Sequence, residues 1–452
     1  MTGELELARR IVDLAKHAGA DAAEATYVVS DRFSTEARGR EVVKLEQSVG
    51  RSLTLRVFVG GGKASLGTSD LSPQGLEHFI RETVDAARFV APDEHAGLPD
   101  AQTTPVANGD ARDVPLDARL LMFSGDVRTR DAAAKIDDAL ELERLTRAAD
   151  ARIVNSSGSR VADATTTVAL ANSLGFAGSY RASQASIGVS PIAADGETKR
   201  TASYGSASRS YAGLERVASV ARKATHRATA MVGARKPPTM RVPVIFERDI
   251  AALVLADLFT AISAASVAIG NSFLAERIGE RVASDLVNVI DDGRIPGGLG
   301  TSPFDGEGVA TRRTPVIEAG TLRTFLYDSY WARRLGARTT GNASGGGIGP
   351  NNFVLEPGAG DLDALVAKTA RGVLVLDTIG FSTESVTGTY SRGARGFLIE
   401  GGELAGPIDE FTIAGNLLDM FGAIDAIAND LVFDQAIVSP SFRVAEMTIS
   451  GQ

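Results

Sequence analysis

The chain has 452 residues and a formal net charge of -9, with 47 Lys and Arg residues against 56 Asp and Glu residues. Its length predicts two domains, because single cores rarely grow beyond about 250–300 residues. The negative charge disfavours non-specific binding to nucleic acid, which depends on neutralising phosphates with Lys and Arg. The chain contains no cysteine, which excludes disulfides, thiolate nucleophiles and cysteine-ligated metals. Its first residues have neither the basic head nor the apolar run of a secretion signal, so we expect a cytoplasmic protein.

The first half of the chain combines helical and strand-like patterns. Apolar residues at helical spacing between residues 7 and 18 predict a helix that ends at Gly19. Alternation of apolar and polar residues predicts strands. We expect further helices over residues 73–89, 129–150 and 212–232, strands over residues 25–30, 51–59, 64–68, 161–171 and 176–190, turns at residues 60–62 and 172–175, and a loop over residues 92–115.

The second half has a different character. Lys236-Pro237-Pro238 predicts the boundary between a domain over residues 1–236 and a domain over residues 237–452. Beyond a strand at residues 241–246, short strands are joined by turns at Ala319-Gly320 and Gly401-Gly402. Helices and strands segregate here, so the sequence predicts an α+β protein. We expect an N-terminal α+β domain and a C-terminal β-rich domain with mostly antiparallel sheets.

Residues 250–270 form a long apolar stretch that contains a single charge, Asp257. A charge near the centre of a bilayer costs about 2.5–3.5 kcal/mol, and no second span follows. The stretch is therefore interpreted as a helix buried in the protein, and we expect no membrane association. Asp257 then requires a partner, because an unpaired buried carboxylate is costly.

The residues with catalytic potential do not form a known motif. The four histidines lie far apart in sequence, with neither a second histidine nor a glutamate at ligand spacing. They are interpreted as surface or capping residues: His17, His78, His95 and His226. There is also no Gly-x-Ser-x-Gly element for a nucleophilic serine. The sequence thus predicts no catalytic residue and no metal ligand in this chain.

Three other segments have structural interpretations that we favour over functional ones. Residues 57–64 resemble a phosphate loop but lack its first glycine and its hydroxyl residue, so we expect a hairpin turn. The glycine-rich residues 345–350 favour a flexible loop or close backbone approach over dinucleotide binding. The acidic pairs 291–292 and 305/307 could bind a hard cation, but Asp and Gly in this order are common in turns.

Several blocks of sequence occur in a characteristic order over nearly the whole chain. They are Asn172-Ser173-Leu174-Gly175-Phe176, Gly279-Glu280-Arg281-Val282-Ala283-Ser284, Ile290-Asp291-Asp292-Gly293, Phe304-Asp305-Gly306-Glu307-Gly308, Ile317-Glu318-Ala319-Gly320, Gly341-Asn342-Ala343, Phe397-Leu398-Ile399-Glu400-Gly401-Gly402 and Thr412-Ile413-Ala414-Gly415-Asn416-Leu417. In these blocks the chain resembles the TldD/TldE metallopeptidase family, whose TldE members are also called PmbA. Residues 107–128 fit least well and are interpreted as an insertion.

The resemblance implies a two-domain fold, a dimer that encloses a cavity, and proteolysis of short or unfolded peptides. In the TldD branch, a helix carries His-Glu-x-x-x-His and a cysteine near the C-terminus is a third zinc ligand. Aligned without gaps, the helix positions fall near Leu255, Ala256 and Thr260, and residues 434–441 contain no cysteine. The chain therefore resembles the TldE branch, which lacks the zinc-binding motif.

This branch implies a non-catalytic subunit without a cofactor of its own. Zinc is expected in a TldD-like partner that forms a heterodimer with this chain, and the isolated chain is expected to self-associate. We expect peptide contacts in glycine- and hydroxyl-rich segments of the second domain, at Asn342, Thr389 and Tyr390. Ordinary turns are the alternative interpretation of these segments.

Two other functions remain open at this stage. One is a self-sufficient hydrolase with an unrecognised site, which bound zinc in the isolated chain would favour. The other is a binding protein that regulates another enzyme, as the older label of the family, modulator of DNA gyrase, suggests. The acidic charge argues against direct contact with DNA in that case.

Overall fold

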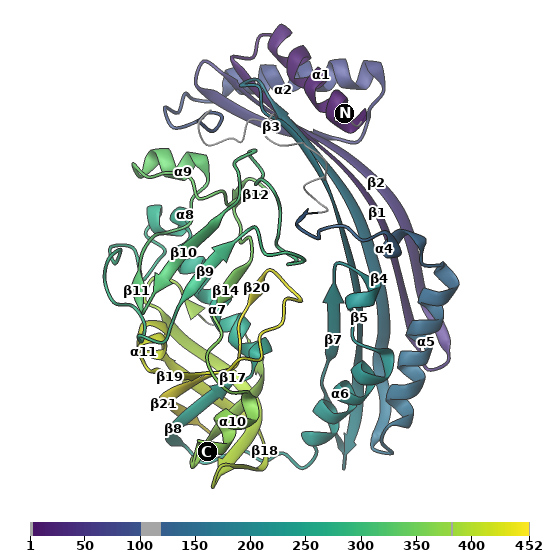
Figure 1. Cartoon of the computed structure of the whole chain (residues 1–452), viewed down its shortest axis with the longest axis vertical. Helices are drawn as coiled ribbons and strands as arrows, with labels where there is room; N and C mark the ends of the chain where they lie inside the picture. Colours follow the sequence, from purple (N-terminus) through teal and green to yellow (C-terminus); the bar gives the residue numbers. More distant parts are fainter. Residues whose placement is uncertain (1–2, 101–118, 381–382, 452) are drawn as a thin grey trace.

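The computed structural model describes residues 3–100, 119–380 and 383–451, and it confirms the α+β class. Its first half consists of one large antiparallel sheet and the helices that cover it (Figure 1). The elements of this half are α1 (Gly3–His17), β1 (Ala22–Arg38), β2 (Glu41–Val59), β3 (Gly62–Thr68), α2 (Pro73–Phe89), α4 (Gly125–Thr129), α5 (Ala132–Ala148), β4 (Ile153–Asn172), β5 (Ala177–Asp195), β6 (Thr198–Thr201), β7 (Tyr204–Ser208), the short 3-10 helix at Tyr211–Gly213 and α6 (Val217–Ala230).

The N-terminal sheet has the strand order β3-β2-β1-β4-β5-β6, and β7 also pairs with β5. Because side chains alternate along a strand, each strand has one covered face and one free face. Ala25, Tyr27 and Ala169 point to the covered face and form a core with α1 and α2. Farther along the same face, Val161 and Ile187 lie in a second core with α5 and α6. The opposite face of the sheet is turned toward the second half of the chain (Figure 1).

The second half is built from two larger sheets and a small hairpin. Its elements are β8 (Met240–Phe246), α7 (Arg248–Ile262), α8 (Ala264–Ala268), β9 (Val289–Asp292), β10 (Arg313–Glu318), β11 (Thr321–Leu322), α9 (Ser329–Arg334), β12 (Ala343–Ser344), β13 (Gly347–Ile348), β14 (Phe353–Leu355), α10 (Leu362–Ala367), β15 (Arg371–Ile379), β16 (Thr383–Glu384), β17 (Thr389–Glu400), β18 (Glu403–Asn416), α11 (Leu417–Gly422), β19 (Ile424–Ile427), β20 (Ile437–Val438) and β21 (Phe442–Ser450).

One of these sheets has the order β11-β10-β9-β14-β20. The other has the order β15-β8-β21-β18-β17-β16, and β15 also pairs with β17, so that five strands close into a ring. The pairing is antiparallel except between β14 and β20 and between β8 and β15. The predicted β-rich, mostly antiparallel character of this half is confirmed.

Helix α7 lies in the largest hydrophobic core of the molecule, between residues of both sheets. It is apolar on most of its circumference, as expected for a helix packed on several sides. The prediction of a single helix over residues 250–270 is wrong in one respect. The helix stops at Ile262, and a short second helix follows. Ser263 adopts an extended conformation and forms a bridge with Leu326, which interrupts the helical hydrogen bonds.

Other predicted elements are confirmed with changed ends. Helix α2 begins at Pro73, where the Ser72 hydroxyl caps it, and it ends at Phe89 as predicted. Strands β1 and β2 are much longer than predicted, since they continue through residues 31–50. Most of the proposed insertion at residues 107–128 lies outside the described residues. Among the residues that are described, no helix is both long enough and apolar enough to cross a membrane.

Candidate functional site

Helix α7 carries the positions at which the resemblance places zinc ligands. Leu255 is only 1% exposed and is part of the hydrophobic core. Ala256 is half-buried, and Thr260 is exposed, with its hydroxyl donating to the Ala256 carbonyl oxygen at 3.1 Å. These side chains offer neither imidazole nor carboxylate groups, so they do not fit a zinc ion. Over the described parts of the chain, no group of three or more His, Cys, Asp and Glu side chains is arranged to hold a metal.

A charge pair occupies the neighbouring part of α7. The Asp257 carboxylate accepts hydrogen bonds from the Arg392 guanidinium, at 2.8 and 3.0 Å, and from the Thr383 hydroxyl, at 3.0 Å. The prediction that Asp257 needs a partner is therefore confirmed. Burial raises the pKa of Asp257, and the charge of Arg392 acts in the opposite direction. The sequence could not identify Arg392, because it lies in β17, 135 residues away.

The interior around this pair contains polar atoms that have no hydrogen-bond partner in the described part of the chain. The Arg392 guanidinium lies over the ring of Tyr390, 5.3 Å from its centroid. Among the described residues, neither the Tyr390 hydroxyl nor the Arg392 Nε has a hydrogen-bond partner. Burial raises the pKa of Tyr390, so that its hydroxyl stays protonated at neutral pH. This region of α7 is thus a small polar cluster within an apolar core.

The C-terminal loop packs against the same helix. Strand β20 contacts α7 and pairs in parallel with β14. In the preceding residues, burial raises the pKa of Asp434, an effect that the nearby Arg248 partly offsets. Ser441 donates its hydroxyl hydrogen to the Asp430 carboxylate at 2.7 Å. The fold therefore brings α7 and residues 434–441 together, as the resemblance implies, but without a ligand set for zinc.

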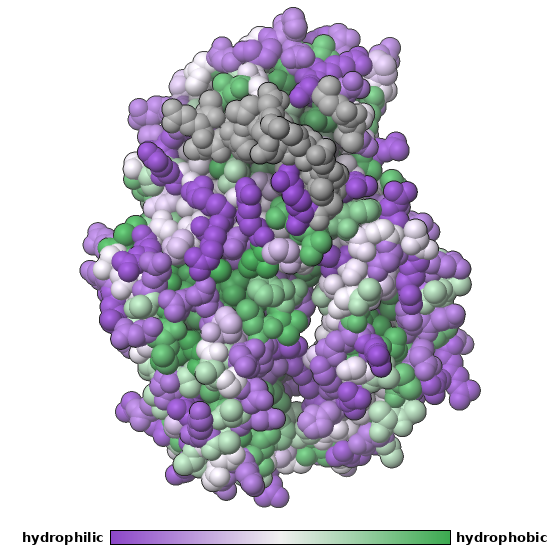
Figure 2. Space-filling view, in the orientation of Figure 1, coloured by the Kyte–Doolittle hydropathy of each residue, from purple (hydrophilic) through white to green (hydrophobic). Residues whose placement is uncertain are grey.

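A cavity of about 410 Å³ lies between the free face of the N-terminal sheet and the second half. The sheet contributes Thr26, Val168 and Tyr180, and the second half contributes Phe304 and the segment at residues 342–345. The ring of Tyr180 packs against Phe304 with 5.2 Å between centroids. Figure 2 shows, toward the bottom of the same view, a narrow gap between the two halves. This cavity is large enough for part of an extended peptide.

Two buried carboxylates hold the loops that border this cavity. Asp291 accepts hydrogen bonds from the side chains of Asn342, at 2.7 Å, and Asn351, at 2.8 Å. Asp305 accepts from the backbone N–H groups of Glu307, Val309 and Ala343. Burial raises the pKa of Asp291 to about 6. Burial and then the charge of Glu307 raise the pKa of Asp305 to about 7. Their oxygens are used by protein donors, which supports the structural interpretation of these acidic pairs.

The three residues predicted to contact peptides lie in different environments. Asn342 is buried, and its amide donates to Asp291 and to the Gly349 carbonyl oxygen. It also borders the cavity between the halves. Tyr390 is completely buried, whereas the neighbouring Thr389 is exposed at the start of β17. In this conformation, only Thr389 offers its side chain to solvent, and peptide binding by these residues stays a prediction.

Arginine side chains connect the two halves around the cavity. Arg56 in β2 forms ion pairs with Glu24 in β1 and, at 3.1 Å, with Glu307 in the second half. Arg209 donates to the carbonyl oxygens of residues 298, 299 and 301. Arg333 donates in the reverse direction, to the carbonyl oxygens of residues 95, 97 and 98. These contacts fix the second half against the sheet, and no local sequence signal predicts them.

The remaining motifs of the sequence have structural roles in the described part of the chain. Residues 60–61 form the turn between β2 and β3, with positive φ at both glycines, so the phosphate-loop resemblance is a hairpin. Gly345 and Gly346 form the turn between β12 and β13. The histidines lie in α1, α2 and α6 and in the loop after α2, well separated along the fold.

Comparisons with known proteins agree with this architecture. Models of three domains match the chain: PmbA/TldA metallopeptidase domain 1 over residues 23–87, the central domain over residues 125–232 and the C-terminal domain over residues 239–451. The chain is 33% identical to a metalloprotease PmbA homolog of Haemophilus influenzae, over 97% of this chain and 94% of that protein. It is 31% identical to metalloprotease PmbA of Escherichia coli O157:H7, over 96% of this chain and 93% of that protein.

Solved structures show the same fold over the whole chain. A proposed modulator of DNA gyrase from Bacteroides thetaiotaomicron superimposes with a TM-score of 0.91 at 27% identity, covering 99% of this chain and 98% of that one. TldE from Thermococcus kodakarensis superimposes with a TM-score of 0.87 at 21% identity, covering 98% of this chain and 99% of that one.

Proposed function

The chain belongs to the PmbA/TldD metallopeptidase family, and from this premise we propose that it is the non-catalytic subunit of a peptidase complex. In this proposal the chain holds no zinc of its own. A TldD-like partner supplies the zinc ion and the catalytic groups, and the complex degrades or processes short or unfolded peptides. The observation that carries the proposal is the composition of α7, where Leu255, Ala256 and Thr260 replace the family's metal-binding and catalytic side chains.

The chemistry of these positions supports the proposal. A catalytic zinc site needs three protein ligands and a general base that reaches the metal-bound water. Leu255 is enclosed by the core, and the hydroxyl of Thr260 is already bonded to the main chain of its own helix. The nearest carboxylate on α7, Asp257, is committed to Arg392. A metal-dependent reaction would therefore need ligands from another chain.

The cavity between the halves supports a role in holding substrate. Its wall is the free face of an antiparallel sheet, with small and hydroxyl-bearing side chains such as Thr26 and Thr166. Extended peptides are commonly bound along strands and through alternate side-chain pockets. A subunit of this kind can shape the enclosed space and exclude folded proteins without carrying out the reaction.

The outer part of β2 supports association with a partner. Strand β3 pairs only with residues 53–59 of β2, so residues 41–52 have one unpaired edge in the described structure. Along this open edge, the side chains of Val43, Leu45 and Val49 are 54%, 55% and 61% exposed. Unpaired edges with apolar side chains are sites of strand addition between chains. We propose that a TldD-like partner binds at this edge.

Metal content and peptide cleavage, measured on the purified chain alone and after mixing with a zinc-bearing TldD-type protein, test the proposal. We expect no stoichiometric zinc and no cleavage by the chain alone. Cleavage should rise in the mixture above that of the TldD-type protein alone, and a chelator should abolish it. Stoichiometric zinc or chelator-sensitive cleavage by the isolated chain would contradict the proposal and favour a self-sufficient hydrolase.

A further inference from the structure

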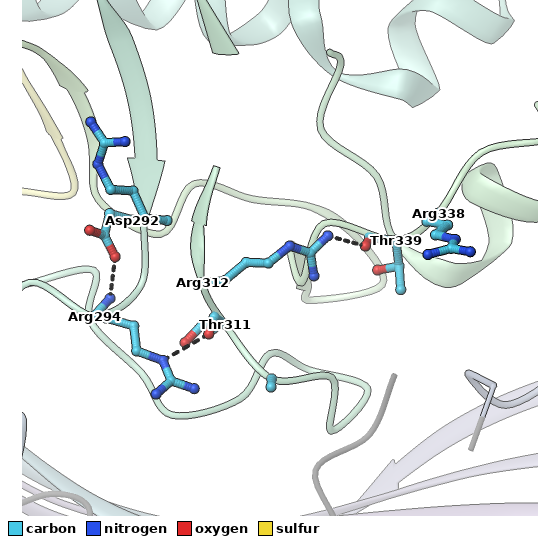
Figure 3. A pocket seen from close by; sticks show the side chains of 8 residues that line it. Asp292, Arg294, Thr311, Arg312, Arg338 and Thr339 are labelled. Atoms are coloured by element: carbon cyan, nitrogen blue, oxygen red, sulfur yellow. Dashed lines mark hydrogen bonds between the residues drawn. The ribbon is translucent and has the colours of Figure 1, made fainter. Parts of the chain in front are cut away.

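A pocket of about 730 Å³ lies beside the sheet that contains β9 and β10, and arginine side chains dominate its wall (Figure 3). We refer to it as the arginine pocket, and its charged residues are Arg294, Arg312, Arg313, Arg338 and Asp292. The lining thus includes four guanidinium groups and one carboxylate, in a chain whose overall charge is -9. The pocket has the size of a typical small-molecule site.

The fold assembles this pocket from separate segments. Asp292 is the last residue of β9 and lies opposite Arg313, the first residue of β10. Arg294 follows β9, Arg312 precedes β10, and Arg338 follows α9. The main chain of residues 311 and 339 forms the wall between these side chains. No contiguous motif contains these arginines, so the sequence alone does not indicate the pocket.

Main-chain oxygens fix the orientation of two of the guanidinium groups. Arg294 Nε donates to the Thr311 carbonyl oxygen at 2.8 Å, and Arg312 donates to the Thr339 carbonyl oxygen at 2.5 Å. Both hydrogen bonds are drawn in Figure 3. A carbonyl group orients a guanidinium without neutralising it, and each guanidinium has five N–H donors. These arginines therefore keep their full charge and have further donors for a ligand.

Ion pairing separates Arg313 from the other three arginines. Arg313 forms an ion pair with Glu356 at 2.7 Å. Asp292 uses one carboxylate oxygen to accept a hydrogen bond from the backbone N–H of Arg294 at 2.8 Å. Within residues 3–100, 119–380 and 383–451, no carboxylate lies within 4.0 Å of the guanidinium nitrogens of Arg294, Arg312 or Arg338. Like charges that share a pocket repel each other, and an anion would relieve this repulsion.

We propose that the arginine pocket binds an oxyanion, the carboxylate or phosphate group of a small ligand, through Arg294, Arg312 and Arg338. Guanidinium groups match such groups in geometry, because paired N–H donors face paired oxygen acceptors. Burial lowers the pKa of Arg312, an effect that only Asp305 opposes, so a bound anion would restore the stability of its charged form. The described residues that line the pocket include no aromatic side chain, which disfavours base stacking and hence single-stranded nucleic acid.

Calorimetric titration of the full chain tests this proposal at low ionic strength. The probes are inorganic phosphate, succinate, and acetyl-trialanine with either a free or an amidated C-terminus. We expect saturable binding of at least one anionic probe, and affinity about tenfold or more weaker in R312Q and in R338Q, because charge-assisted hydrogen bonds are lost. Binding of phosphate alone would identify a phosphate ligand. Binding of the free but not the amidated peptide would identify a terminal carboxylate.

A matched control is available on the other sheet. Arg241 is an exposed arginine paired with Glu446 at 2.7 Å, so R241Q changes the net charge by the same amount and should leave anion affinity unchanged. R338Q removes no hydrogen bond or ion pair that the described structure contains, so it separates binding from folding even if R312Q destabilises the chain. The proposal is overturned if no anionic probe binds at millimolar concentration. It is also overturned if R338Q, like the control R241Q, binds the anionic probes with the affinity of the unchanged chain.

Discussion

The cluster around Asp257 and the arginine pocket contain similar charged groups in opposite arrangements. Beside α7, one carboxylate and one guanidinium are paired, with side-chain exposures of 17% and 8%. In the arginine pocket, three guanidinium groups have no carboxylate partner among the described residues and border an open space. A paired charge within a core positions structural elements, whereas unpaired charges around a pocket are available to a ligand. The two regions therefore differ in whether their charged side chains are paired, more than in whether charged residues are present.

The largest effect is expected when the pair beside α7 is broken. Arg392→Met should lower the free energy of unfolding by about 3 kcal/mol, because Asp257 would remain buried without a counter-charge. Chemical denaturation measures this difference. Replacing both partners, as Asp257→Leu with Arg392→Met, should restore most of the loss. Arg241→Met, which removes an exposed pair, should change stability by less than about 0.5 kcal/mol. Equal losses in the single and double variants would contradict this interpretation.

A second prediction concerns Asp305, a buried carboxylate that accepts hydrogen bonds from neutral backbone N–H groups, in contrast to Asp257. The pKa of Asp305 is raised from 3.8 to about 7, so the folded chain holds this proton over a range in which the unfolded chain has lost it. Stability should therefore fall as pH rises from about 4 to 7. Asp305→Asn should reduce the slope in this window by up to about 1.4 kcal/mol per pH unit. Unfolding measured at several pH values checks this, and an unchanged slope would be evidence against it.

A third prediction concerns the open edge of β2, where a new negative charge is introduced at the proposed interface with the partner. Leu45→Asp should weaken association with a TldD-type partner about tenfold, because it puts a charge in an apolar contact next to the unpaired strand. Analytical ultracentrifugation measures the dissociation constant. Leu174→Asp, at a similarly exposed leucine in the β4–β5 turn, is the control and should have no effect. Equal weakening by both variants would exclude β2 as the specific interface.

The smallest effect is expected on α7 itself. Thr260→Ala removes only a hydroxyl that is bonded to the helix backbone, so stability should change by less than about 0.5 kcal/mol. Peptide turnover by the assembled pair should also remain the same. A large loss of turnover would show that Thr260 takes part in catalysis, against the proposed function.

The sequence predicted best those features that depend on neighbouring residues. Helix α2 has the predicted ends because Ser72 caps it and Pro73 suits its first turn. The sequence predicts turns at residues 60–62 and 401–402, because glycine adopts positive φ without strain, and the structure has them at residues 60–61 and 401–402. For Asp257, the sequence predicted that a partner was needed, but the identity of Arg392 depends on how α7 packs against β17.

Features that depend on distant segments were not predictable. Residues 41–52 of β2 are exposed on both faces, and apolar and polar side chains alternate only over residues 43–46, which is too short to reveal a strand of this length. The interruption at Ser263 comes from its bridge to Leu326, not from a helix-breaking residue. The same holds for the arginine pocket, whose residues come from three separate segments. In each case, tertiary contacts decide the local structure.

The order of strands in the N-terminal sheet has a consequence for synthesis of the chain. Strand β1 lies between β2 and β4, with Glu24 opposite Asn172. Until β4 leaves the ribosome, a finished hairpin of β1 and β2 exposes a long second edge on β1. At typical rates of about 5–20 residues per second, this state lasts roughly ten seconds. During this period the open edge of β1 can pair with other chains, so slow pairing with β4 prolongs the time in which the nascent chain is open to aggregation.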